Sequence, residues 1–149
     1  MNKEINIELN KFPTIPNDLR NQSSINTPVS EFIVDLCRLY HHYYFDSYGQ
    51  SPPNPNHGNF EYLKFLSSSN DFRFLGDGPG ASTSKKRTIS QDLGQAFCRY
   101  FLYEFLGINY FAHMDKVLNK KTHPAFCGME IKRISKGDVP DYLCARSAT

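Results

Sequence analysis

The chain has 149 residues, of which 40% are hydrophobic, 14% aromatic and 21% charged, and its net charge is +2. This length and apolar content suffice to bury a hydrophobic core in one domain, which excludes a compositionally disordered protein. No apolar run approaches the roughly 18 residues of a transmembrane helix, and residues 1–7 lack the apolar run of a signal peptide. We therefore expect a soluble, cytoplasmic protein with no membrane partner.

The charge is unevenly distributed along the chain. Residues 1–81 contain 6 Lys or Arg and 9 Asp or Glu, whereas residues 82–149 contain 11 and 6. A basic C-terminal half can attract an anion or a nucleic acid, although a solvated, lysine-rich surface gives the same composition. The four cysteines (Cys37, Cys98, Cys127 and Cys144) are far apart, and we expect buried thiols.

Residues 1–27 are polar and only weakly patterned. Ile5, Ile7 and Leu9 alternate with polar residues, which predicts a short strand. We expect an N-terminal arm that packs on the body of the protein or on a partner, followed by a single domain over residues 28–149.

The first long helix is predicted over residues 28–48. Thr27 is a suitable N-terminal cap, Pro28 suits the first turn and Gly49 is a C-terminal stop. Apolar side chains recur at steps of three and four residues: Val29, Phe32, Ile33, Leu36, Cys37, Tyr40 and Tyr44.

A proline-rich loop over 51–59 and a short apolar block over 60–66 separate this helix from a glycine-rich, then basic, loop over 76–87. The glycines and Lys85, Lys86 and Arg87 have some features of a phosphate-binding loop, but the Gly-Lys-Ser/Thr ending is absent, so a mobile surface loop is the alternative. A second helix is predicted over 89–106, with Thr88 or Ser90 as its cap.

The remaining sequence has the pattern of strands. Strands are predicted over 108–112, 129–134 and 139–145, with a turn over 135–138. Helices followed by a small sheet indicate an α+β fold, in which the two long helices pack on a C-terminal sheet.

Three charged residues in this C-terminal region could act together. On a strand, alternation puts Glu130 and Lys132 on one face, and Asp115 follows the preceding predicted strand. Two carboxylates and a lysine at a sheet edge can bind Mg²⁺ and position a water molecule against a phosphodiester. The alternative is that Glu130 and Lys132 form the solvent-exposed face of an ordinary strand.

The order of helix 89–106, a strand, Asp115, and a strand with Glu130-Ile131-Lys132 resembles the core of the PD-(D/E)xK nuclease superfamily over residues 88–145. The resemblance implies a restriction-endonuclease-like α/β core, in which Asp115 and Glu130 hold Mg²⁺ and Lys132 acts on the water. Asp115 departs from the family pattern because Met114, and not proline, precedes it.

A second alignment to the same family is possible. Val139-Pro140-Asp141-Tyr142-Leu143-Cys144 is similar to the Pro-Asp strand of the family. This alignment implies that Asp141 is a metal ligand and that the acid-x-Lys strand falls after residue 149, as in a truncated or degenerate relative.

Two functions follow as expectations. The first is a metal-dependent nuclease, or a degenerate nuclease-fold domain that binds DNA or RNA, in a defence system. Its phosphate contacts would be Lys85, Lys86, Arg87, Lys120 and Lys121. The second is a non-catalytic module or subunit that binds a protein partner through helix 28–48, whose aromatic residues are Tyr40, Tyr43, Tyr44, Phe45 and Tyr48.

Overall fold

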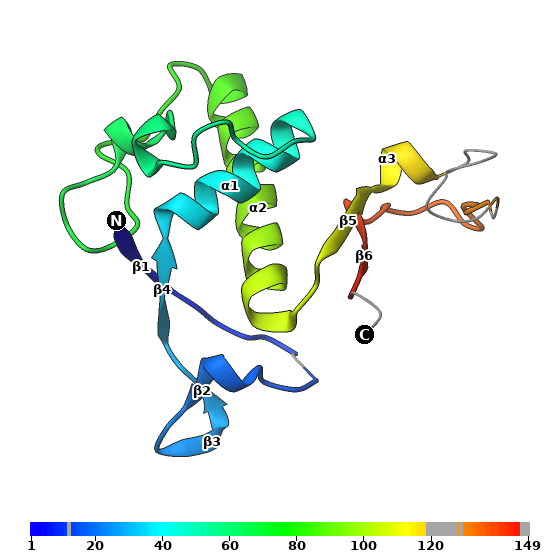
Figure 1. The fold of residues 1–149 in the computed structure, drawn as a ribbon, viewed down its shortest axis with the longest axis horizontal. Coiled ribbons are helices and arrows are strands. Elements are labelled where there is room, and N and C mark those ends of the chain that lie inside the picture. The colour runs from blue at the N-terminus through cyan, green and yellow to red at the C-terminus, as the bar shows by residue number, and fades with distance from the viewer. Residues whose placement is uncertain (12, 119–127, 129, 147–149) are drawn as a thin grey trace. The chain divides into compact units, whose positions relative to one another are not determined.

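The structure, a computed structural model, describes residues 1–11, 13–118, 128 and 130–146 (Figure 1). Helices and small antiparallel sheets alternate along the chain, which confirms the α+β fold class. Chain contacts divide it into two compact units, Met1–Leu106 and Gly107–Thr149, called here the N-terminal and C-terminal units. This contact boundary at residue 106 does not coincide with the boundary expected at residue 27.

The N-terminal segment is part of the N-terminal unit. Strand β1 (Asn2–Asn6) pairs antiparallel with β4 (Glu31–Asp35), with Ile5 opposite Phe32. Lys3 is buried, and its ammonium group donates to the carbonyl oxygens of Ser67, at 2.8 Å, and Ser69. Because a buried lysine needs such acceptors, these bonds fix β1 to the loop over residues 67–70.

The prediction of a helix over residues 28–48 is wrong for residues 28–35. Residues up to Pro28 form β3 (Ser24–Pro28), which pairs with β2 (Arg20–Asn21), and the next residues form β4. Helix α1 covers only Leu36–Tyr48. Its cap is Asp35, whose carboxylate accepts the Cys37 backbone N–H at 2.8 Å. The expected stop at Gly49 is confirmed, since this residue has a left-handed φ of 71°.

Helix α2 (Thr83–Leu106) begins six residues earlier than the sequence predicts. Ser82 Oγ accepts the Lys85 backbone N–H at 3.2 Å, so the cap lies before Thr83 and not at Thr88. Thr88 lies inside the helix and donates to the carbonyl of Ser84. The basic residues of the expected loop are therefore helical.

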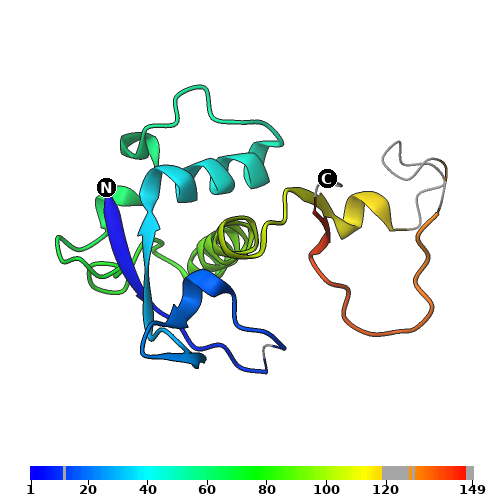
Figure 2. The same cartoon turned by 60° about the horizontal axis from the view of Figure 1, so that its bottom comes forward.

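The core of the N-terminal unit lies between α1, α2, β4 and the segment over residues 60–66. Figure 2, which looks nearly along α2, shows α1 lying across it. Aromatic rings meet edge to face through this core, as in the pairs Tyr43–Tyr62 and Phe60–Tyr62, both with 5.5 Å between ring centroids. The buried members are Val34, Leu36, Leu39, Tyr40, Tyr43, Phe60, Tyr62, Leu66, Ile89, Leu93, Ala96 and Tyr100.

The C-terminal unit contains an antiparallel pair, β5 (Tyr110–His113) and β6 (Tyr142–Ala145), and the short helix α3 (Met114–Val117). Two of the three predicted strands thus form, with shifted ends. The strand predicted over 129–134 is wrong, because the described part makes only an isolated parallel bridge, between Ile131 and Leu118. After it, the Arg133 guanidinium donates to the carbonyl oxygens of Ser135 and Gly137, which holds the backbone in a turn.

Within the described part of the chain, no helix is both long and apolar enough to cross a lipid bilayer. Of the cysteines in that part, Cys37 and Cys144 are half-buried and Cys98 is exposed, so the expectation of buried thiols is wrong for Cys98. Cys127 lies outside the described residues.

Candidate functional site

Two of the expected metal ligands lie at one end of the β5–β6 pair. His113, the last residue of β5, stands opposite Tyr142, the first residue of β6. Just beyond this pair, the backbone N–H of Met114, which follows β5, donates to the carbonyl of Asp141, which precedes β6, at 3.0 Å. Asp115 follows Met114, so the structure brings the backbones of Asp115 and Asp141 together, with both side chains exposed.

Glu130 and Lys132 flank Ile131 at the bridge to Leu118, directly after α3. The Lys132 ammonium lies 3.1 Å from a Glu130 carboxylate oxygen, which agrees with the expectation that these side chains share a face. The side chain of Lys132 is 68% exposed and that of Glu130 is 31% exposed. An ion pair this accessible contributes at most about 1 kcal/mol, so it leaves both groups available to a ligand.

Asp115 and Asp141 thus lie on segments that a hydrogen bond joins. Glu130 precedes Ile131, which forms a bridge to Leu118, the residue after α3. Among the described residues, however, no three His, Cys, Asp or Glu side chains are close enough to hold a metal ion together. The structure therefore does not by itself assemble a metal site from these carboxylates.

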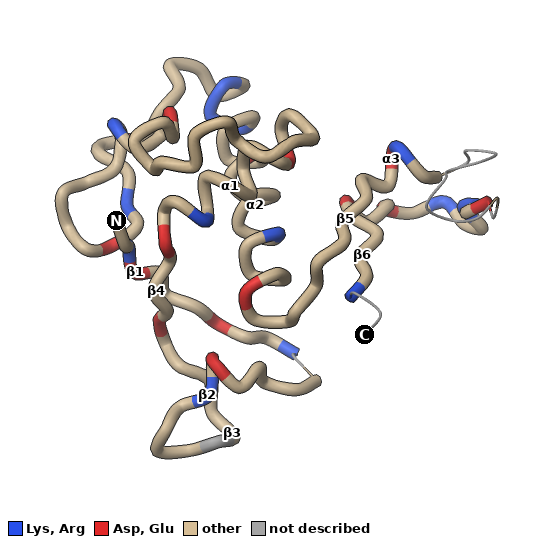
Figure 3. The backbone as a smooth tube through the Cα atoms, viewed as in Figure 1, with Lys and Arg blue, Asp and Glu red and all other residues tan. Residues whose placement is uncertain are grey.

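The expected phosphate contacts divide between the units. Lys85, Lys86 and Arg87 lie in the first turns of α2, in the N-terminal unit, and Lys86 lies 3.6 Å from a carboxylate oxygen of Asp77. Lys120 and Lys121 belong to the C-terminal unit but lie outside the described residues. Figure 3 shows Lys and Arg in α3 and in the segment that precedes β6.

The exposed cations of the C-terminal unit form a larger set than the sequence indicated. Residues 107–149 contain seven Lys or Arg and four Asp or Glu. The exposed ones among the described residues are Lys116, Lys132, Arg133, Lys136 and Arg146. Lys116 directly follows Asp115 in the sequence, so this carboxylate also has a lysine beside it.

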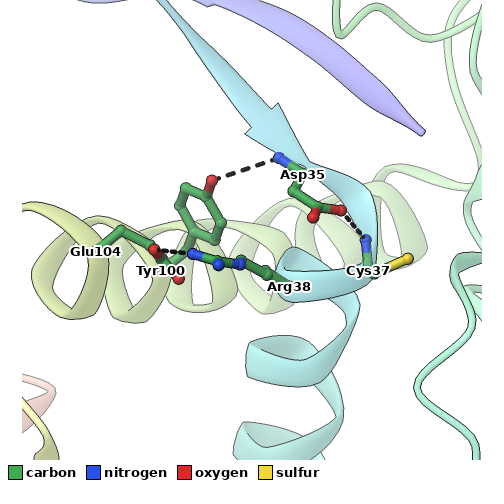
Figure 4. A network of polar contacts seen from close by, with 5 residues as sticks. All are labelled: Asp35, Cys37, Arg38, Tyr100 and Glu104. Carbon is green, nitrogen blue, oxygen red and sulfur yellow. Dashed lines mark hydrogen bonds and ion pairs between the residues drawn. The ribbon is translucent and has the colours of Figure 1, made fainter.

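A polar network between α1 and α2 had no local sequence signal. The Arg38 guanidinium lies 2.5 Å from Glu104, and the Tyr100 hydroxyl accepts the Asp35 backbone N–H at 3.3 Å (Figure 4). Arg38 and Glu104 are 66 positions apart, so only the packing of α1 on α2 brings them together. Burial raises the pKa of Tyr100.

A hollow of about 470 Å³ lies beside this network, and His42 is one of its lining residues. Burial, followed by the nearby positive charge of Arg99, lowers the pKa of His42 to about 4. Its Nδ1 atom is buried and forms no hydrogen bond with a described residue. The ring is therefore neutral at pH 7 and is held by ring contacts with Tyr100 and Tyr103.

The aromatic residues expected to face a partner serve mainly as core. Tyr40 and Tyr43 are buried, and the Tyr43 hydroxyl donates to Glu61. Tyr48 is the most exposed ring of α1, at 62%. These placements leave little of α1 as a continuous aromatic surface.

The chain was compared with protein-family models, curated protein sequences and solved structures, and none of them matches it.

Proposed function

We propose that the C-terminal unit is a nuclease-like domain of degenerate type, which binds the phosphodiester backbone of DNA or RNA with the help of Mg²⁺. The observation that carries this proposal is the position of Asp141 directly before β6, which pairs antiparallel with β5 after the long helix α2. In the second alignment to the PD-(D/E)xK family, Pro140-Asp141 leads into the Pro-Asp strand, and β6 begins at the residue after Asp141.

The first alignment has less support. It needs Glu130 and Lys132 on a strand, whereas Ile131 makes only an isolated bridge. The proposal therefore assigns Asp141 to the cation, and it adds Asp115 because the hydrogen bond from Met114 to Asp141 brings the two backbones together. Glu130 and Lys132 then lie beside the bound phosphate, and the site favours binding over cleavage.

Phosphate contacts come from the exposed cations of the same unit. Lys116 lies in α3 beside Asp115, and Lys136 lies in the turn that leads to Asp141. Lysines that neutralise phosphates release condensed counterions, so affinity falls as salt rises, with a slope of about −0.7 to −0.9 per phosphate contact. This salt dependence distinguishes phosphate binding from docking of an apolar partner.

The test uses the full chain and fluorescein-labelled single- and double-stranded DNA and RNA in a fluorescence anisotropy titration with Mg²⁺ at several NaCl concentrations. We expect binding that weakens steeply with salt, and a shallower slope in Lys116→Glu and Lys136→Glu. Lys64→Glu makes the same charge change at an exposed site of the N-terminal unit and is the matched control. A salt-independent affinity, or equal losses in all three variants, would contradict the proposal.

A parallel incubation with Mg²⁺ or Mn²⁺ separates binding from cleavage. We expect bound nucleic acid to remain intact. Cleavage that Glu130→Ala abolishes, in a protein with an unchanged circular dichroism spectrum, would show instead that the site is a complete nuclease.

A further inference from the structure

A cysteine and a histidine form a pair at the start of α1, in the N-terminal unit. The Cys37 sulfur lies 3.5 Å from His57 Nδ1, which is within hydrogen-bond reach for a sulfur atom. His57 opens a short 3₁₀ helix, His57–Asn59, which contacts α1 after the proline-rich loop. Neither residue belongs to the aromatic core or to the nucleic-acid site proposed above, so the pair is independent of that proposal.

Backbone and side-chain bonds fix the position of His57. The Phe60 backbone N–H donates to the His57 carbonyl at 2.9 Å, and Phe60 is buried in the core. The Asn56 side chain, which caps the 3₁₀ helix, accepts the Gly58 backbone N–H, also at 2.9 Å. The imidazole is thus carried by a segment that is tied to the core beside α1.

Cys37 is the second residue of α1, so it lies at the positive end of a helix of 13 residues. Two charged residues of the same segment flank it. The Asp35 carboxylate accepts the Cys37 backbone N–H, and Arg38 is paired with Glu104. In Figure 4 the sulfur points away from Arg38 and Glu104. His57 is the base that the structure places within reach of the thiol.

A thiol beside an imidazole is the arrangement of an activated nucleophile. In the tautomer that carries its proton on Nε2, His57 accepts the S–H proton at Nδ1 while the sulfur attacks. Cys37 and His57 are both half-buried, which leaves the sulfur accessible to a small reagent.

The surroundings of Cys37 favour a small, uncharged oxidant over a carbonyl or phosphate substrate. Attack on a carbonyl group needs donors for the oxyanion, and the backbone N–H of Cys37 itself is taken by Asp35. The Asp35 carboxylate also repels an anionic phosphate ester. A hydroperoxide is uncharged, and its leaving oxygen takes a proton from His57, so it needs no oxyanion site.

We propose that Cys37 is a redox-active thiol, which His57 activates and which a hydroperoxide oxidises to a sulfenic acid. As the S–H proton moves to His57 Nδ1, the sulfur attacks one peroxide oxygen, so that an S–O bond forms and the O–O bond breaks. An electron pair passes from the sulfur to the peroxide, which is reduced. The imidazolium gives its proton to the leaving oxygen, which departs as water when the oxidant is hydrogen peroxide, and neutral His57 is restored.

The test treats the full chain with hydrogen peroxide in the presence of dimedone, which traps sulfenic acids, and follows the adducts by mass spectrometry. We expect the adduct to form faster on Cys37 than on Cys98, even though Cys98 is the more exposed thiol. Accessibility alone favours Cys98, so this order distinguishes an activated thiol from one that is merely exposed.

Two matched substitutions test the role of His57. In His57→Gln, adduct formation on Cys37 should be at least about tenfold slower, because the base is lost, and it should be unchanged on Cys98. His41→Gln makes the same change one helical turn after Cys37 on α1. We expect it to react like the unaltered protein, because His57 is the histidine bonded to the Cys37 sulfur.

Three results would overturn the proposal. The first is a Cys37 adduct that forms no faster than the Cys98 adduct. The second is an equal rate at Cys37 in His57→Gln and in the unaltered protein. The third is an equal loss in His57→Gln and His41→Gln, which would indicate a general change around α1 and not the removal of a base.

Discussion

The two units of the molecule use charged side chains in different ways. The N-terminal unit buries a few charged groups and gives them partners: Arg99 lies 3.6 Å from Asp46, with both side chains less than 10% exposed, and Lys3 donates to two carbonyl groups. In the C-terminal unit, every Asp, Glu, Lys and Arg among the described residues is exposed. Buried ionic groups hold a fold in place, whereas exposed ones are free to meet a ligand.

The same difference holds for apolar side chains. The N-terminal unit has a continuous aromatic and aliphatic core, while Met114 and Val117 are the buried side chains among the described residues of the C-terminal unit. Stability should therefore depend mainly on the first unit, and ligand chemistry on the second.

The largest expected effect is a loss of stability when a core leucine is shortened, and one leucine from each unit is compared. Leu39 is fully buried in the core, so Leu39→Ala should lower the free energy of unfolding by about 2–5 kcal/mol. The matched substitution is at Leu143, which is half-buried in β6. Leu143→Ala should lower the free energy of unfolding by clearly less. Urea denaturation followed by circular dichroism measures both. Equal losses would contradict the contrast between the units.

The next effect concerns acid sensitivity. The pKa of His42 is about 4 in the folded protein and about 6.5 in the unfolded chain, so the unfolded chain binds more protons between these values. The free energy of unfolding should therefore have its full value above pH 6.5. It should decrease by about 3 kcal/mol as the pH falls to 4, because protonation of His42 then favours the unfolded chain.

Thermal melts between pH 4 and pH 7 check this expectation. His42→Phe keeps an aromatic ring against Tyr100 and Tyr103 but does not titrate. We expect its stability to change less over this range. An identical pH profile in both proteins would show that His42 is not the source of the acid sensitivity.

The smallest effect is expected at the ion pair between Glu130 and Lys132. Because Lys132 is mostly exposed, Lys132→Ala should change the free energy of unfolding by less than about 1 kcal/mol. A larger loss in urea denaturation would indicate that this pair holds the C-terminal unit together and is not available to a ligand.

Local sequence signals predicted the structure wherever the deciding contacts are themselves local. The end of α1 at Gly49 and most of α2 follow from such signals. In contrast, Thr27-Pro28 imitates a helix start, yet residues 31–35 form a strand because they pair with β1, about thirty positions earlier. The start of α2 is an exception, because the local cap at Ser82, which extends the helix through Lys85–Arg87, was not recognised in the sequence.

The candidate site was predictable to a similar extent. Glu130 and Lys132 form an ion pair, but the strand on which the prediction placed them does not form, since Ile131 makes only an isolated bridge to Leu118. The nearness of Asp115 and Asp141 depends on a bond between residues 27 positions apart, from Met114 to Asp141. The contact between Phe72 and Phe97, with 5.0 Å between ring centroids, likewise joins two residues that no sequence motif connects.

The central claim is that Asp141 helps to hold Mg²⁺ against a bound phosphate. It is tested most directly by the affinity for a labelled oligonucleotide with and without Mg²⁺, in Asp141→Asn and in Asp138→Asn. Both residues are exposed carboxylates of the same unit, and only Asp141 is joined to α3 through Met114. We predict that Mg²⁺ strengthens binding in the unaltered protein and in Asp138→Asn but not in Asp141→Asn; an equal response in all three would contradict the claim.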